Sequence, residues 1–93
     1  MVAAFEVLGH IRDIEIPIRE MCRVATRLVV FTVWSNHVTV VTEERFRNSR
    51  FIHTAFSHAD ILKAIESALD VPYTVKTIPV NEYSLAYIIS KEI

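Results

Sequence analysis

Residues 27–34 constrain the fold most, because they form a short run whose apolar side chains occupy both alternating faces. The run reads Arg-Leu-Val-Val-Phe-Thr-Val-Trp, rich in β-branched and aromatic residues. Such a pattern is typical of a central strand that is covered on both faces. The run is also far shorter than the roughly 20 apolar residues that span a bilayer. The sequence therefore predicts a sheet built around this segment and no membrane anchor.

Helical periodicity appears both before and after this run. Around Asp13 to Ala25, apolar residues recur at helical spacing: Ile14, Ile18, Met21, Cys22 and Ala25. Farther on, Ser57 and Asp60 resemble a capping box, in which a hydroxyl caps the first turn and a carboxylate reaches back. The predicted helix that follows ends before Pro72 and has the apolar stripe Ile61, Leu62, Ile65, Ala68 and Leu69.

Further strands are predicted at the two ends of the chain. Ala3 to Leu8 is a short apolar run bounded by Gly9, which fits a buried strand. Tyr73 to Ile78 and Tyr83 to Ser90 indicate an antiparallel hairpin, whose last strand is apolar on both faces and belongs inside the sheet. The predicted fold is thus α/β, a mixed sheet with two main helices that ends in an antiparallel β-hairpin.

The middle of the chain is less regular. After a turn at Ser35-Asn36, the residues Val38, Val40 and Val41 fit either a hairpin partner or a short extension. Thr42 to Arg50 is polar and charged, which indicates an exposed loop or a frayed helix.

Length and composition limit the classes of protein that remain. A chain of 93 residues accommodates one domain, so we expect residues 1–93 to form a single one. The 52% hydrophobic content against 23% charged residues excludes disorder and leaves little polar surface to cover a small core. We therefore expect the chain to bury apolar surface against a partner.

Charge and cysteine content point to an intracellular protein that does not bind nucleic acid. The formal net charge is -1, without the basic excess that attracts phosphate backbones. Arg45, Arg47 and Arg50 alternate with Phe46 and Phe51, but the neighbouring Glu43 and Glu44 cancel much of their charge. The single cysteine, Cys22, suits a reducing compartment, and its helical-stripe position favours inert packing. No secretory signal pattern precedes it, so a cytoplasmic location is expected.

Few residues indicate chemistry by themselves. His53, His58 and Asp60 cross a loop-to-helix boundary without a shared helical face, so no metal site is predicted. Trp34, Tyr73, Tyr83 and Tyr87 are interpreted as core and sheet residues rather than a ligand cage. His10 directly follows a glycine that ends a strand, a place where functional residues project in α/β sheets, although the residues by themselves favour a solvated loop histidine.

The order of these segments resembles the second half of class I S-adenosylmethionine-dependent methyltransferases. Residues 3–11, Ala-Ala-Phe-Glu-Val-Leu-Gly-His-Ile, resemble the fourth strand of that family and the loop after it. Residues 18–25, Ile-Arg-Glu-Met-Cys-Arg-Val-Ala, resemble the next helix, and residues 27–34 the fifth strand. Phe51 to Leu69 is similar to the following helix with its lead-in, and the end of the chain to the closing β-hairpin.

The resemblance implies a Rossmann-like half domain. In the family, a glycine-rich loop and an acidic strand end hold the cofactor, and both would lie upstream of Met1. With one glycine, this chain carries no such loop. What carries over is Leu8, Gly9 and His10, which in relatives lie beside the reactive end of the cofactor. The proline-glycine that usually precedes the fifth strand is replaced by Ala25-Thr26.

The resemblance therefore predicts a truncated or split methyltransferase-like protein, inactive alone. S-adenosylmethionine would bind only with a partner subunit carrying the missing half, or through homo-oligomerisation. His10 would orient the substrate or accept a proton. The strand at Ala3 to Leu8 would expose an edge, covered by its own copy, by that subunit or by Val38 to Val41. The alternatives are a non-enzymatic homodimeric α+β interaction module and a gene fragment without a selected role.

Overall fold

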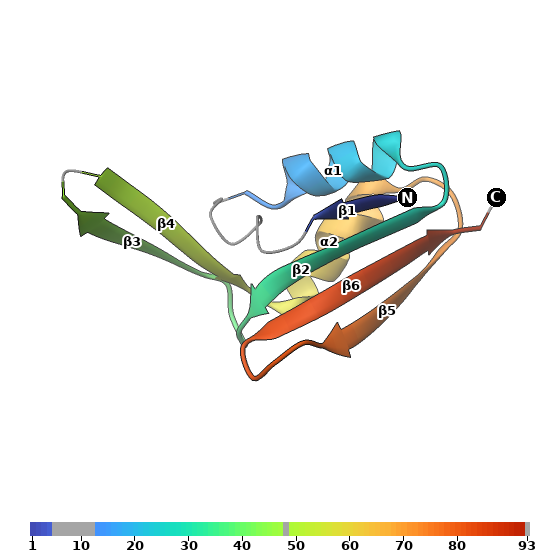
Figure 1. The fold of residues 1–93 in the computed structure, drawn as a ribbon. Coiled ribbons are helices and arrows are strands. Elements are labelled where there is room, and N and C mark those ends of the chain that lie inside the picture. The colour runs from blue at the N-terminus through green and yellow to red at the C-terminus, as the bar shows by residue number, and fades with distance from the viewer. Residues whose placement is uncertain (5–12, 48, 93) are drawn as a thin grey trace.

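The structure, a computed structural model, describes residues 1–4, 13–47 and 49–92. Its elements follow in this order: β1 (Val2–Ala4), α1 (Glu15–Val24), β2 (Leu28–Ser35), β3 (Val40–Phe46), β4 (Ser49–Phe56), α2 (His58–Ala68), β5 (Tyr73–Pro79) and β6 (Ser84–Lys91). Figure 1 shows their arrangement, an α/β fold with one mixed sheet and both helices packed against it.

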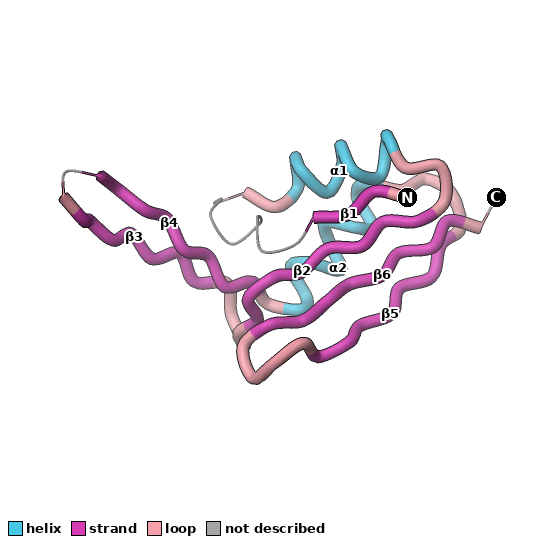
Figure 2. The backbone as a smooth tube through the Cα atoms, in the orientation of Figure 1, coloured by secondary structure: helices cyan, strands magenta, loops and turns pink. Residues whose placement is uncertain are grey.

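The strand order of the sheet is β3-β4-β2-β6-β5, and β1 pairs with β2 beside β4. β1 runs parallel to the first half of β2, with Ala3 opposite Val30, whereas β4 runs parallel to its end, with Ser35 opposite Phe56. On the other side β6 is antiparallel to both β2 and β5. The central position of β2, the terminal hairpin and the interior position of β6 confirm the predictions from sequence (Figure 2).

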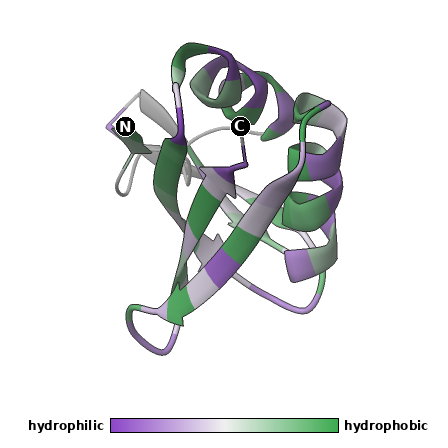
Figure 3. Ribbon diagram, turned by 90° about the vertical axis from the view of Figure 1, so that its right-hand side faces the viewer, coloured by the Kyte–Doolittle hydropathy of each residue, from purple (hydrophilic) through white to green (hydrophobic). Residues whose placement is uncertain are grey.

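The hydrophobic core lies between the helices and one face of the sheet. Alternate residues of the two central strands face it, and all are nearly inaccessible: Val29, Phe31 and Val33 on β2, Tyr87 and Ile89 on β6. α1 and α2 contact each other over this face, so both lie on the same side of the sheet (Figure 3). On the opposite face Val30 and Ile88 are half-buried and Thr32 is buried, but neither helix covers this face. The expected covering of both faces of β2 is therefore wrong for the second face.

The predicted helical stripes account for most of the packing. Ile14, Ile18, Cys22 and Ala25 are buried along α1, with Met21 partly buried beside them. In α2 the buried residues are Ile61, Ala64 and Ile65, whereas Leu62 is 38% exposed, so its assignment to the stripe is wrong. The reason is geometric, because the stripe follows the i, i+3, i+4 positions from Ile61, which selects Ala64 and Ile65 instead of Leu62.

The segment from Thr42 to Arg50 is not a loop or a frayed helix. It lies within an antiparallel hairpin, in which β3 pairs with β4 from Val40 opposite Ala55 to Phe46 opposite Ser49. The connection is two residues long, and Arg47 has a φ of 50°, the positive value that tight hairpin turns require. Val40 and Val41 therefore pair with β4 and not with β1, and residues 51–56, likened to a helix lead-in, are strand.

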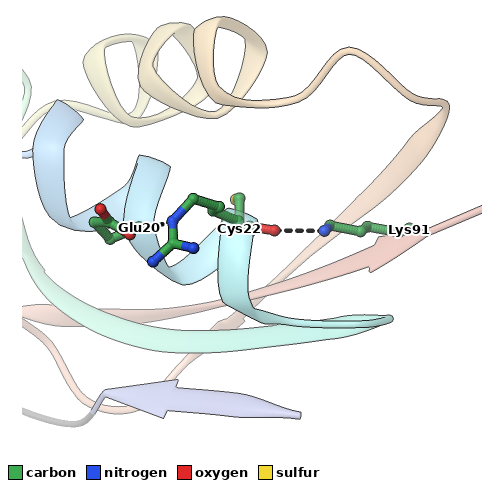
Figure 4. Close-up of polar contacts among 4 residues, drawn as sticks. Glu20, Cys22 and Lys91 are labelled. Carbon is green, nitrogen blue, oxygen red and sulfur yellow. Dashed lines mark hydrogen bonds and ion pairs between the residues drawn. The ribbon is translucent and has the colours of Figure 1, made fainter.

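The last strand is tied to the first helix by Lys91. Its Nζ donates to the carbonyl oxygen of Cys22 (Figure 4). The same Nζ also donates to the carbonyl oxygen of Ala25 at 2.8 Å. These carbonyls lie at the end of α1, where backbone oxygens have no partner within the helix and a cation is favourable. The Lys91 side chain thus provides hydrogen bonds for carbonyl oxygens at the end of a helix that is far away in the sequence, and it holds α1 against β6.

Candidate functional site

The carboxyl ends of the parallel strands define the edge where a site is expected. β1, β2 and β4 run in the same direction, and each helix follows a strand, so α1 and α2 both begin at this edge. In open α/β sheets ligands bind outside the carboxyl ends of the strands, where helix N-termini also present free N–H groups. The topology therefore gathers the starts of both helices around one region.

A cleft of about 270 Å³ lies in this region. Its walls come from the first turns of both helices, from the end of β4 and from the segment after β2. The lining residues are Asp13, Ile14, Glu15, Thr39, Phe56, Asp60 and Lys63. Three of these side chains are carboxylates and one is an ammonium group, so the cleft favours cations and hydrogen-bond donors.

Asp60 is held in the cleft by a closed network of hydrogen bonds. The backbone N–H of Asp60 donates to Ser57 Oγ at 3.1 Å, and the backbone N–H of Ser57 donates to Thr39 Oγ1 at 3.1 Å. The Thr39 hydroxyl in turn donates to the Asp60 carboxylate. The predicted cap at Ser57 is confirmed, but the carboxylate reaches back through Thr39 instead of contacting the Ser57 amide directly.

This network sets the protonation of Asp60. The hydrogen bond from Thr39 is the main cause that lowers the pKa of the carboxyl group, and Ser57 and the charge of Lys63 add to it. A hydrogen bond to the ionised form favours that form. Asp60 is therefore an anion across the physiological range and only a weak base near neutral pH.

The start of α1 supplies a second fixed carboxylate. Ile14 occupies the N-cap position without a side-chain cap, and Asp13 Oδ1 instead accepts the backbone N–H of Glu15 at 2.9 Å. Asp13 and Glu15 therefore place negative charge at the positive end of the helix dipole. Both side chains are exposed and line the cleft.

The predicted site residues Leu8, Gly9 and His10 lie outside the described residues. Ala4 ends β1 just before that segment, and Asp13, the first described residue after it, lines the cleft. The part of the cleft contributed by Thr39 and Lys63 was missed by sequence reasoning. No local signal marks Thr39, because its partner Asp60 lies 21 positions away in the sequence and only the fold brings them together.

The other candidates from sequence do not form a common site. His53 lies against Trp34 with ring centroids 5.5 Å apart, whereas His58 contacts Tyr87 and Asp60 contacts Thr39. Within residues 1–4, 13–47 and 49–92, no group of three potential ligands could hold a metal ion. Cys22 is buried and burial raises the pKa of its thiol, which makes it unreactive.

The aromatic residues divide between the core and the surface. Tyr87 is fully buried and Tyr73 is partly buried against the core, as expected for sheet residues. Tyr83 is 71% exposed and precedes β6, so its assignment to the strand is wrong. Its backbone N–H donates to Asn81 Oδ1 at 2.8 Å, which makes Tyr83 part of the turn between β5 and β6.

Comparison with known proteins adds no family assignment. No helix among the described residues is long and apolar enough to cross a membrane. The chain matches none of the protein-family models and none of the curated proteins with which it was compared.

Proposed function

We propose that this chain is the second half of an S-adenosylmethionine-dependent methyltransferase-like fold and does not transfer methyl groups by itself. One observation carries the proposal: β1, α1 and β2 form a parallel βαβ unit, with a cleft at the carboxyl edge and an antiparallel hairpin at the end of the chain. These elements follow the order that the resemblance in sequence implies, whereas the β3–β4 hairpin between β2 and α2 is an addition to it.

The residues present do not form a complete cofactor site. The chain contains a single glycine, so no glycine-rich backbone cradle can approach a nucleoside-type ligand within it. The acidic cleft at Asp13, Glu15 and Asp60 offers only side-chain contacts. We therefore assign this half to the acceptor side of the reaction and the binding of the methyl donor to another subunit or a second copy.

Two free surfaces support such a partner. Over the described residues β1 pairs only with β2, so its other edge is open to another strand. The half-buried sheet face opposite the helices carries apolar residues such as Val30 and Ile88. A small domain with this much apolar surface gains stability when another layer covers it.

Within this proposal, His10 orients the acceptor or receives its proton. The proposal includes a cytoplasmic location, because a reducing compartment suits the free, buried Cys22. The rate would come from holding donor and acceptor in line, without a covalent intermediate on the protein. His10→Ala in a reconstituted complex should lower the rate, whereas Glu66→Ala, which changes an exposed residue of α2 that lines neither pocket, should not. An unchanged rate for His10→Ala removes the assignment of His10 but leaves the proposal for the chain.

The decisive measurement is isothermal titration of S-adenosylmethionine and S-adenosylhomocysteine into the purified chain, with its mass in solution measured in parallel. Under the proposal, the monomer binds neither compound, and saturable binding appears only in a homo-oligomer or after addition of a subunit that carries a glycine-rich loop. A well-folded dimer that binds neither compound, alone or with such a subunit, contradicts the proposal.

That last outcome favours the second candidate function, a non-enzymatic homodimeric α+β interaction module. The observation in its favour is the half-buried apolar face of the sheet, which such a dimer would cover. The two candidate functions differ in the role of the cleft. The methyltransferase-like protein requires it on the acceptor side of the reaction, whereas an interaction module does not require its carboxylates.

A further inference from the structure

A second pocket, of about 390 Å³, lies at the same edge of the sheet. It is formed where β2 ends, where α2 begins and where β5 turns into β6. Its lining residues are Ser35, Asn36, His37, His58, Ala59 and Glu82. None of these residues lines the cleft described above, so this pocket is independent of the proposed methyl transfer.

His58 is held in this pocket by a buried tyrosine. His58 Nδ1 lies 2.7 Å from the hydroxyl oxygen of Tyr87, and the two rings are stacked with centroids 5.7 Å apart. Tyr87 is completely inaccessible and its ring stacks on Phe31 at 5.3 Å. The imidazole therefore rests on a side chain that the core holds rigidly.

The buried hydroxyl decides which nitrogen of His58 carries the proton. Burial raises the pKa of Tyr87 to about 12, so the phenol keeps its hydrogen. Among the described residues, Nδ1 of His58 is the partner shown for this hydroxyl. If Nδ1–H were the donor, the phenol hydrogen would lack an acceptor, at a cost of about 1–3 kcal/mol for a buried donor. The hydroxyl therefore donates to Nδ1, and neutral His58 carries its hydrogen on Nε2.

We propose that His58 and Glu82 form a binding site for a carboxamide group. The carbonyl oxygen of the ligand accepts a hydrogen bond from His58 Nε2–H, and its amide N–H₂ donates to the Glu82 carboxylate. Because Tyr87 occupies Nδ1, Nε2 is the ring nitrogen left to face the pocket that His58 lines. A carboxamide bonds to both exposed side chains at once, whereas an anion is repelled by the charge of Glu82 and an ammonium group offers no acceptor to His58.

The first test is the tautomer of His58 in the ¹⁵N-labelled protein at pH 8, where imidazoles are largely neutral. Long-range ¹H–¹⁵N spectra should show the hydrogen on Nε2. In Tyr87→Phe, which keeps the ring but removes the hydroxyl, this preference should weaken. A wild-type spectrum with the hydrogen on Nδ1 overturns the proposal, whether or not the variant folds.

The second test is titration with benzamide, benzoate and benzylamine, which share a ring and differ in the polar group. Benzamide should shift the His58 ring signals saturably, with a dissociation constant on the order of 1 mM for so small a ligand. Benzoate and benzylamine should bind at least about tenfold more weakly, because each satisfies only one of the two groups. Absence of a saturable benzamide shift, or equal affinity for all three compounds, overturns the proposal.

The role of Glu82 has a matched control on α2. Glu82→Gln should weaken benzamide binding several-fold, whereas Glu66→Gln, which alters an exposed carboxylate that does not line the pocket, should leave it unchanged. Both side chains are exposed, so neither variant is expected to unfold. Equal effects of the two substitutions would show that the charge of the surface, and not the site, governs binding.

Discussion

Tyr87 shows how a single residue can serve the core and a surface pocket together. Its ring is stacked against both Phe31 and His58, and its hydroxyl is the polar group that reaches the start of α2. Phenylalanine would supply the same packing without the hydrogen bond. The residue therefore links the stability of the core to the orientation of His58.

The raised pKa of Tyr87 predicts a loss of stability at high pH. Below pH 10 the phenol is protonated in both the folded and the unfolded chain, whereas between pH 10 and 12 only the unfolded chain ionises. The free energy of unfolding should fall in this window by about 1.4 kcal/mol per pH unit from this group alone. Urea unfolding at pH 9 and pH 11.5 measures it, and Tyr87→Phe should show a smaller fall. Equal falls in the two proteins would contradict the prediction.

Cys22 should react with thiol reagents only when the chain opens. Its side chain is 1% exposed, and burial raises the pKa of the thiol although the charge of Lys91 opposes this shift. Because the thiolate is the nucleophile, a buried thiol with a raised pKa reacts slowly. Labelling with a disulfide reagent at pH 8 should be at least about 100-fold slower in buffer than in urea. Rapid labelling of the native protein would show that α1 detaches readily.

Asp60 should lose part of its acidity when Thr39 is replaced. In Thr39→Val the main hydrogen bond to the carboxylate is removed, so its pKa should rise toward the ordinary value for aspartate. At a pH above the ordinary pKa of aspartate, ionised Asp60 contributes to the free energy of unfolding. This contribution is lost as the pH falls through the lowered pKa of Asp60 in the folded chain. NMR titration of the carboxyl carbon measures the shift, with Thr74→Val on exposed β5 as the control. An unchanged Asp60 titration would exclude the network as its cause.

At the level of elements, α2 depends on its N-cap. Ser57 is 7% exposed and its hydroxyl accepts the backbone N–H of Asp60, so Ser57→Ala removes an acceptor from the first turn. We expect a loss of about 1 kcal/mol in the free energy of unfolding, as for other N-cap serines. Ser67→Ala makes the same chemical change at an exposed position of the helix and should be neutral or slightly stabilising. Urea denaturation of both variants checks the difference.

The two hairpins differ in how they are supported. β6 has a paired strand on each side, whereas the β3–β4 hairpin joins the sheet only where the end of β4 meets β2 and otherwise projects away from it (Figure 1). Residues 40–54 therefore rely mainly on pairing with each other. An isolated two-stranded hairpin is marginally stable in water.

For the whole molecule, this asymmetry predicts a gradient of hydrogen exchange. Amides at the centre of β2 and β6 should exchange only through global unfolding, because they lie beneath both helices and between paired strands. Amides of residues 42–46 should exchange at least about 100-fold faster. Exchange followed by mass spectrometry resolves the two regions. Equal protection would mean that the hairpin is covered by a partner or a second copy.

The predictions from sequence succeeded where local pattern and packing agree. Residues 27–34 became the central strand, Ser57 the helix cap and residues 73–90 the terminal hairpin, because each has a clear period or cap signal. The β3–β4 hairpin was missed because its strands are polar and charged over much of their length. Strand pairing in such a segment is decided by the turn at Arg47 and by cross-strand neighbours, and the polarity of the residues does not indicate it.

The sequence by itself determined the elements with strong hydrophobic periodicity and the order of those elements. The reason is that the spacing of apolar residues in a stripe is a local property of the chain. Only the tertiary structure decided that both helices cover one face and that Thr39 closes the network at Asp60. It also decided that Tyr87 reaches His58, a pair separated by 29 positions. These features depend on contacts between segments that are distant in the sequence, and those contacts form only when the strands pair in the correct register. No short stretch of sequence can therefore predict them.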